Sequence, residues 1–215
     1  MDEGTNMTLN PWRSIWLKPR ATIRQIVTTD PDRHVLALIA ANSVIGAVLA
    51  GVTSALQGQF GLLFLLLLVL VVAPIFAVLM LYLVALLLRW TGRWLGGVAS
   101  SRDLRAALAW GCVPSLLAGA ALLVALLVPG LDLFPTPPPE LQSVPFALAT
   151  YGLGSKIQLL AGVWSLFTMI KCIAEVQGFS AWRALGNYLL AILMIIVVIV
   201  AIAAGVGVLA AFVAK

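Results

Sequence analysis

The chain has 215 residues, of which 62% are hydrophobic and 10% are charged, and its mean hydropathy is +1.10. Soluble domains carry about a quarter charged residues, so this composition excludes an ordinary water-soluble protein and predicts an integral membrane protein. The net charge of +5 does not indicate nucleic acid, because eleven of the thirteen Lys and Arg lie in the N-terminal segment or in two connecting loops and their edges.

The N-terminal segment, residues 1–33, is polar and basic, and it lacks the apolar core of a signal peptide. Residues 11–27 place tryptophan and isoleucine side chains at helical spacing among basic residues, on both sides of Pro19. Tryptophan favours the headgroup level, and each basic residue adds about 1 kcal/mol of attraction to anionic lipid. We therefore predict an amphipathic element lying on the membrane, or else a basic topology signal without fixed structure. Its candidate contact residues are Trp12, Arg13, Trp16, Lys18 and Arg20.

The first predicted span covers residues 34–56. Asn42, Gly46 and Ala50 recur in it every four residues, and a stripe of small side chains lets a second helix approach closely. The amide of Asn42 needs hydrogen-bond partners within the membrane. We expect it to bond a neighbouring helix or, alternatively, to line a ligand site.

The second predicted span, residues 60–88, is long and uncharged. Its 29 residues would reach roughly 43 Å as a helix, whereas the hydrocarbon core of a bilayer is about 30 Å thick. Pro74 lies at its midpoint and predicts a kink, because proline removes one backbone hydrogen bond. A soluble helix this apolar on every face would have no surface to cover it, so the pattern indicates a transmembrane helix.

A basic loop rich in tryptophan follows the second span. Arg89 and Arg93 alternate there with two tryptophans, which is typical of interfacial anchors, and both arginines are candidate contact residues for lipids or partners. Ser100 and Asp103 stand three residues apart just before the next apolar run. This spacing predicts a capping box at the start of a helix.

The third predicted span covers residues 104–128. Gly111, Ser115 and Gly119 repeat every four residues in it, so we predict tight helix packing at these positions, as at Gly46 in the first span. Pro114 lies within the same stripe. It predicts a bend in this span.

Residues 129–145 contain six prolines and are predicted to form a stiff, exposed connector. The apolar stretch after them is interrupted near Lys156, so we predict a fourth span at 157–173, with the Lys156 ammonium reaching the headgroups. If Lys156 lay at membrane depth instead, it would form a candidate functional site together with Gln158.

The last span is predicted at residues 184–213, which brings the total to five. Eleven Lys and Arg lie in the N-terminal segment and in the loops after spans two and four, whereas Lys156 and Lys215 lie on the opposite side. Because basic loops stay in the cytoplasm, we place the N-terminus there and the C-terminus across the membrane. Residues 1–33 then form a cytoplasmic segment, and residues 34–215 form the membrane domain.

The sequence contains no catalytic constellation that we recognise. The predicted spans hold no Asp or Glu, one histidine cannot form a two-histidine metal site, and the HExxH, GxSxG and glycine-rich phosphate-loop motifs are missing. Cys112 and Cys172 fall in apolar segments, which favours buried thiols over a disulfide framework. We therefore expect no catalytic residues, metal or cofactor, and an intramembrane enzyme is the least favoured class.

Three stretches carry a family resemblance. They are residues 11–26, with tryptophan followed by Pro-Arg-Ala-Thr, residues 109–114, with a proline among small residues, and residues 174–184, before the last span. In this order they resemble the Yip (Ypt/Rab-interacting protein) domain family of five-span membrane proteins, in its bacterial form. Eukaryotic members act in vesicle traffic and bind small GTPases, but this chain lacks their fuller Asp-Leu-Tyr-Gly-Pro signature.

Together, the residues and the resemblance predict an all-α polytopic membrane bundle with five transmembrane helices and an N-terminal amphipathic segment, in a bacterial inner membrane. The leading hypothesis is a non-enzymatic scaffold or interaction protein whose partners are membrane lipids, other membrane proteins or further copies of the chain. The alternative is a small transporter or channel for an ion or small solute. Its candidate cavity residues are Asn42, Pro74, Pro114, Lys156 and Gln158.

Overall fold

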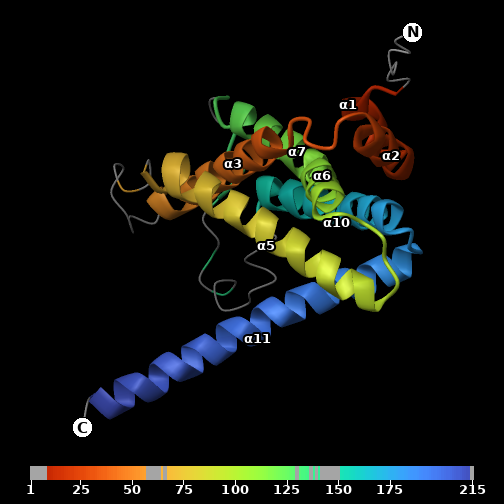
Figure 1. Cartoon of the computed structure of the whole chain (residues 1–215). Helices are drawn as coiled ribbons and strands as arrows, with labels where there is room; N and C mark the ends of the chain where they lie inside the picture. Colours follow the sequence, from red (N-terminus) through yellow and green to blue (C-terminus); the bar gives the residue numbers. More distant parts are fainter. Residues whose placement is uncertain are drawn as a thin grey trace.

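The structure is a computed structural model that describes residues 9–56, 64, 67–128, 131–135, 138, 140 and 151–213. The start of the predicted second span and most of the proline-rich connector lie outside the described residues, as does Lys215. The described part is helical and contains no strand (Figure 1). Its elements are α1 (Pro11–Ser14), α2 (Pro19–Thr29), α3 (Val35–Leu56), η1 (Leu68–Val72), α5 (Ala73–Trp94), α6 (Ser101–Gly111), α7 (Val113–Ala125), α10 (Leu153–Gln177) and α11 (Ala181–Val213).

Several of these helices are long and apolar enough to cross a bilayer. Within the described residues they are Leu68–Trp94, Ser101–Ala125, Leu153–Gln177 and Ala181–Gly205, and Val35–Ala50 is a shorter apolar helix. The predicted all-α polytopic bundle is therefore confirmed. In Figure 1, α3, α5, α6, α7 and α10 pack together, while α11 leaves them and ends far from the bundle.

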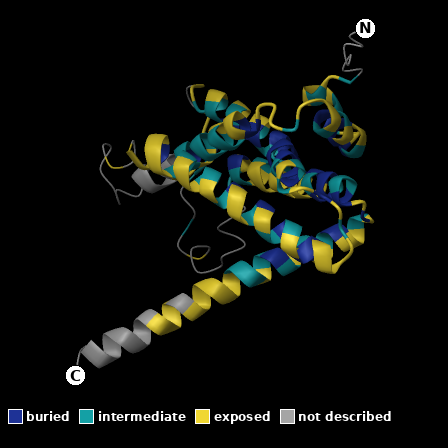
Figure 2. Cartoon of the chain, in the orientation of Figure 1, coloured by how far each residue is buried: buried dark blue, intermediate teal, exposed yellow. Residues whose placement is uncertain are grey.

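The outer faces of the bundle are apolar, as a lipid environment requires. Figure 2 shows exposed residues along α5 and over the middle of α11, beyond its contacts with the other helices. Ile75, Phe76 and Leu79 of α5 are each more than half exposed, and so are Val197 and Ile199 of α11. An apolar surface this extensive would associate in water but is satisfied by lipid chains.

Each of the two prolines predicted to distort a span lies just after an irregular turn. Pro74 stands in the first turn of α5, directly after the π-helical stretch η1, where the Ala73 N–H donates to the carbonyl of Leu68. The wider turn tolerates the missing backbone hydrogen bond, because Pro74 has no N–H to donate. Pro114 stands in the first turn of α7, and the helix is interrupted before it at Cys112.

The helix boundaries otherwise follow local signals. The predicted capping box is confirmed: the Ser100 hydroxyl accepts from the Asp103 N–H, and the Asp103 carboxylate accepts from the Ser100 N–H. α10 begins at Leu153, four residues before the start that the sequence predicted. The helix reaches back that far because Gly152, with a φ of 84°, turns the chain into it and the Gly154 N–H donates to the carbonyl of Leu133.

Two glycines allow the closest approach between helices. A methyl group at Gly111 of α6 would lie 2.7 Å from the Cα atom of Met169 in α10. One at Gly119 of α7 would lie 2.6 Å from the Cγ2 atom of Ile45 in α3. The core surrounding these contacts consists mainly of small and aliphatic side chains, and Trp110 is fully buried in it.

Candidate functional site

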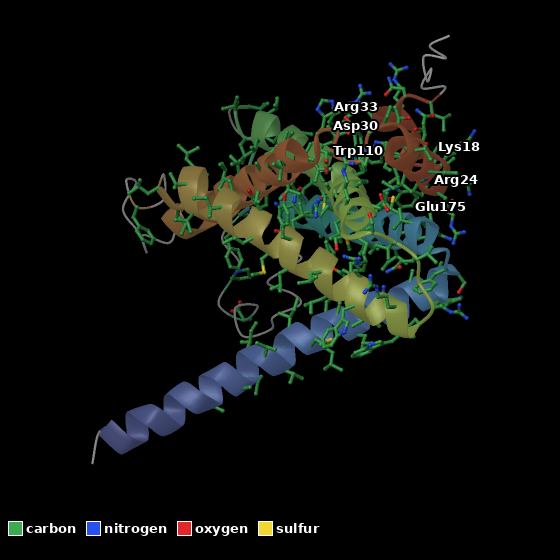
Figure 3. All side chains as sticks on the ribbon, in the orientation of Figure 1. Lys18, Arg24, Asp30, Arg33, Trp110 and Glu175 are labelled. Atoms are coloured by element: carbon green, nitrogen blue, oxygen red, sulfur yellow. The ribbon has the colours of Figure 1, made fainter. Side chains whose placement is uncertain are left out.

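Most basic side chains of the described residues gather at one end of the bundle, which we call the basic end. It comprises α1, α2, the segment 95–100 after α5, the start of α6 and the turn 178–180 between α10 and α11. In Figure 3 the labelled side chains Lys18, Arg24 and Glu175 lie beside α2 at this end. The basic residues in these elements and the turn after α2, in the C-terminal parts of α5 and α10, and at the start of α11 are Arg13, Lys18, Arg20, Arg24, Arg33, Arg89, Arg93, Arg102, Arg105, Lys171 and Arg183.

The N-terminal segment folds as α1 and α2 and docks onto the bundle. Ile15, Ile23 and Ile26 are at most 1% exposed and belong to the same core cluster as residues of α6 and α10. The apolar face that the sequence placed against lipid is thus covered by protein. Burial of each such side chain stabilises the docked position by about 1.5–3 kcal/mol, which outweighs the attraction of a single basic residue to a membrane.

Polar contacts hold α2 in place. The Arg24 Nε donates to the Glu175 carboxylate of α10 at 2.6 Å, and the same two groups form an ion pair. The Arg20 Nη2 donates to the carbonyl of Phe179 at 3.3 Å. Lys171 lies one helical turn before Glu175 on the same helix, but the ion-pair partner of Glu175 is Arg24, which reaches it from α2.

The turn between α2 and α3 is fastened to the start of α6. The Asp32 carboxylate accepts from the Arg102 Nε at 2.7 Å, and the Arg105 Nη2 lies 4.0 Å away. The Arg102 hydrogen bond holds the pKa of the Asp32 carboxyl below its ordinary value of 3.8. This interaction crosses between two segments that are separated by about 70 residues in the chain.

An aromatic cluster lies between α1, the start of α3 and α6. The Trp12 and Trp110 rings meet edge to face, with their centroids 5.3 Å apart, and His34 lies 6.4 Å from Trp12 and 6.5 Å from Trp110. The Trp110 Nε1 donates to the carbonyl of Arg33 at 3.3 Å. His34 itself is exposed and has a φ of 57°, so it turns the chain into α3.

A buried polar network joins α5, α10 and α11. The Gln177 Nε2 and the Asn187 Nδ2 both donate to the carbonyl of Leu88, at 3.0 and 3.2 Å. The Gln177 Oε1 accepts from the Ala99 N–H at 3.3 Å, and the Asn187 Oδ1 lies 2.6 Å from the Thr91 hydroxyl. With both amides at most 2% exposed, this network fixes the mutual position of three helices at the basic end.

Sequence reasoning did not identify Gln177, Asn187 or Thr91. The available signal was two amides beside apolar helices, a pattern that indicates interhelical hydrogen bonding. Their partners are backbone groups from distant segments, so the network could not be located without the fold. Gly92 and Gly97 were missed for the same reason: a side chain at either one would collide with the amide of Gln177.

The predicted contact residues divide into exposed and structural groups. Trp12, Arg13, Lys18 and Arg93 are exposed at the basic end. The others bond within the protein. Trp16 donates to the carbonyl of Trp12, Arg20 contacts Phe179 as described, and the Arg89 Nη1 donates to the Ser101 hydroxyl at 3.4 Å.

Only some of the predicted cavity residues are brought together. Asn42 and Gln158 line an open hollow of about 220 Å³ between α3, α7 and α10, and Ser115 lines it as well. Pro74 and Pro114 are absent from its lining and stand in the first turns of α5 and α7. Lys156 is exposed in the first turn of α10 and does not line the hollow either.

The residues predicted for helix packing occupy different environments. Gly111 and Gly119 lie at the close approaches described above, and the Ser115 hydroxyl donates to the Asn42 Oδ1 at 3.3 Å. The Ser115 N–H donates to the Ser165 hydroxyl of α10 at 2.8 Å. At Gly46 an added methyl group would meet nothing within 4 Å, because this glycine borders the hollow.

Within the part of the chain that the structure describes, no three His, Cys, Asp or Glu side chains are grouped so that they could hold a metal ion. The candidate sites are the basic end, with its exposed aromatic and cationic side chains, and the hollow that Asn42, Ser115 and Gln158 line.

Comparison with known protein families matches residues 13–204 to the Yip1 domain. The match covers most of the chain, from within α1 to within α11. Proteins of this family are generally membrane proteins without enzymatic activity. No curated protein matches the chain, and no solved structure does either.

Proposed function

From the premise that this chain belongs to the Yip1 domain family of integral membrane proteins, we propose that it is a non-enzymatic scaffold or interaction protein. Its working surface is the basic end, where it engages lipids and partner proteins. By the excess of Lys and Arg at this end, the surface faces the cytoplasm and the C-terminus lies across the membrane. We propose that the protein resides in a bacterial inner membrane.

One observation carries the proposal: side chains suited to recognition stay exposed on a well-packed part of the protein. Trp12 is 40% exposed although its ring contacts Trp110, and Arg13 beside it is exposed as well. At the end of α5, Trp90 and Trp94 are 50% and 60% exposed. Tryptophan and arginine on a rigid support are the residues that most often dominate binding energy at protein interfaces.

Photo-crosslinking in cells tests this proposal. Benzoyl-phenylalanine is placed at Arg13 or Arg93, and at Phe76 as a control, because Phe76 is exposed on the lipid-facing side of α5. We expect discrete protein adducts from the first two positions that disappear when Trp12→Ala is added. Adducts of equal yield from Phe76, or adducts unaffected by Trp12→Ala, would contradict an interaction surface at the basic end.

The polar hollow supports a second candidate function, transport of an ion or small solute. Asn42, Ser115 and Gln158 line it on three helices, and polar side chains facing a cavity in a membrane are typical of solute paths. Flux into proteoliposomes that contain the purified protein tests this function, with Asn42→Leu as the variant. Flux that this substitution abolishes would favour transport, whereas equal flux in both proteins would exclude a path through the hollow.

A further inference from the structure

Two neighbouring hollows at the basic end meet at the C-terminal part of α10. The first has a volume of about 390 Å³ and is lined by the start of α2, from Leu17 to Ala21, together with Phe167 and Lys171. The second, of equal volume, runs between α10 and α11 and shares Phe167 and Lys171 with the first. The two hollows therefore adjoin each other at Phe167 and Lys171.

The first hollow is cationic. Lys18, Arg20 and Lys171 all line it, and no carboxylate does. The nearest acidic side chain along α10, Glu175, is paired with Arg24. Arg20 is held by the carbonyl of Phe179, which fixes its guanidinium and leaves further N–H donors for a ligand. Three positive charges around one opening would bind a phosphate group.

The second hollow is apolar. Lys171 provides its only charged side chain, and the Lys171 Nζ lies 5.2 Å from the centre of the Phe167 ring, at the junction of the two hollows. From there the groove follows α10 to Val163, a distance of about 12 Å along the helix axis. Its lining residues are Val163, Leu166, Phe167, Ile170, Lys171, Ala181, Trp182 and Leu185.

We propose that the two hollows form one binding site for an anionic phospholipid, whose phosphate binds Lys18, Arg20 and Lys171 and whose acyl chain lies between α10 and α11. The order of groups along the site matches the order in a lipid, with charge at the basic end and apolar surface toward the membrane interior. Trp182, which is 82% exposed beside the groove, sits at the level that tryptophan prefers. This site deepens the proposed function by naming the class of lipid engaged there.

Two other occupants fit the surface less well. A free phosphate ion would satisfy the three cations but would leave the apolar groove uncovered. A helix from another protein would cover the groove with apolar side chains, but it would also need acidic side chains placed against Lys18 and Lys171, for which the described residues provide no ion-pair partner. A lipid with a negative headgroup covers both hollows at once.

The test is native mass spectrometry of the purified, delipidated full chain with added phosphatidylglycerol or phosphatidylcholine of identical acyl chains. We expect the wild-type protein to retain phosphatidylglycerol preferentially, and the double variant Lys18→Gln/Lys171→Gln to lose about 30-fold in that retention. Lys156→Gln, at the opposite end of α10, is the matched control and should bind as the wild type does. Circular dichroism and gel filtration verify that each variant is folded.

A second variant tests the groove without changing any charge. Val163→Trp fills the groove from an exposed position and should reduce phosphatidylglycerol retention severalfold. Unchanged retention in both variants, or equal retention of the two lipids by the wild-type protein, would overturn the proposal. Because no partner protein is present, this result is independent of the crosslinking at Arg13 and Arg93, and either proposal can fail while the other stands.

Discussion

The basic end and the distal half of α11 differ in what surrounds their side chains. At the basic end, Leu88, Trp110 and Asn187 are fully buried, and helices are joined by hydrogen bonds between distant segments. Along the distal half of α11, Val198 and Val200 are more than half exposed and the helix diverges from the bundle (Figure 1). Tertiary packing holds the first region, whereas the second relies on lipid.

This contrast identifies the contacts that determine how the helices associate. Between helices in lipid, apolar side chains gain little from contacting one another rather than acyl chains, so close fit and polar bonds decide which helices associate. Both are concentrated at the basic end and along the contacts of α6 and α7 with their neighbours. We therefore expect substitutions there to destabilise the fold more than substitutions on α11 beyond the bundle.

The largest effect is expected at Gly111. In Gly111→Ala the new methyl group would press on the backbone of Met169, so α6 and α10 must separate, at a cost of about 1–3 kcal/mol. Thermal unfolding in detergent measures the loss. Gly162→Ala is the control, because nothing lies within 4 Å of a methyl group there, and it should leave the unfolding temperature unchanged or slightly raised. An equal loss of stability in both variants would show that the close contact between α6 and α10 at Gly111 is not the cause of the loss.

A smaller loss is expected when the buried network is cut. Asn187→Leu removes the hydrogen bond to the carbonyl of Leu88 and leaves the Thr91 hydroxyl without its amide partner, which should cost about 1–2 kcal/mol. Asn42→Leu provides the comparison. Its amide bonds Ser115 beside an open hollow, so we expect a loss of about 0.6 kcal/mol. Chemical denaturation measures both losses. A larger loss for Asn42→Leu than for Asn187→Leu would mean that the hydrogen bond between Asn42 and Ser115 contributes more to stability than the buried network does.

The ion pair between α2 and α10 should contribute less. The Arg24 side chain is 70% exposed and that of Glu175 is 14% exposed, so solvent screens much of the attraction and a coupling energy below about 1 kcal/mol is expected. A double-mutant cycle with Arg24→Gln and Glu175→Gln measures it. A coupling energy of several kcal/mol would mean that this pair, rather than the buried isoleucines, holds α2 on the bundle.

The smallest effect is a dependence on pH at the turn before α3. The pKa of Asp32 is lower in the folded protein than its ordinary value of 3.8, so its interaction with Arg102 stabilises the fold above pH 3.8. That contribution is lost as the pH falls below 3.8 and through the folded pKa. Unfolding temperatures measured from pH 6 down to pH 3 should fall more in wild type than in Asp32→Asn. Parallel curves would contradict this assignment.

Local sequence signals predicted several features of the fold. The capping box at Ser100 and Asp103 depends on residues three positions apart, so the sequence was sufficient to locate it. The irregular turns before Pro74 and Pro114 follow from the missing N–H of proline. The apolar stretches themselves predicted a polytopic helical bundle, because a bilayer sets the length that a helix needs.

Other features depended on which segments meet in space. The amphipathic pattern of α2 is the same whether lipid or protein covers its apolar face, and the tertiary structure decided in favour of protein. In the same way, the sequence shows that Lys18, Arg20 and Lys171 are basic, but about 150 residues separate the first two from the third. Periodicity and composition determine what one helix needs to bury or solvate. The fold alone determines which partner supplies it, because that choice depends on shape and hydrogen bonds between segments far apart in the chain.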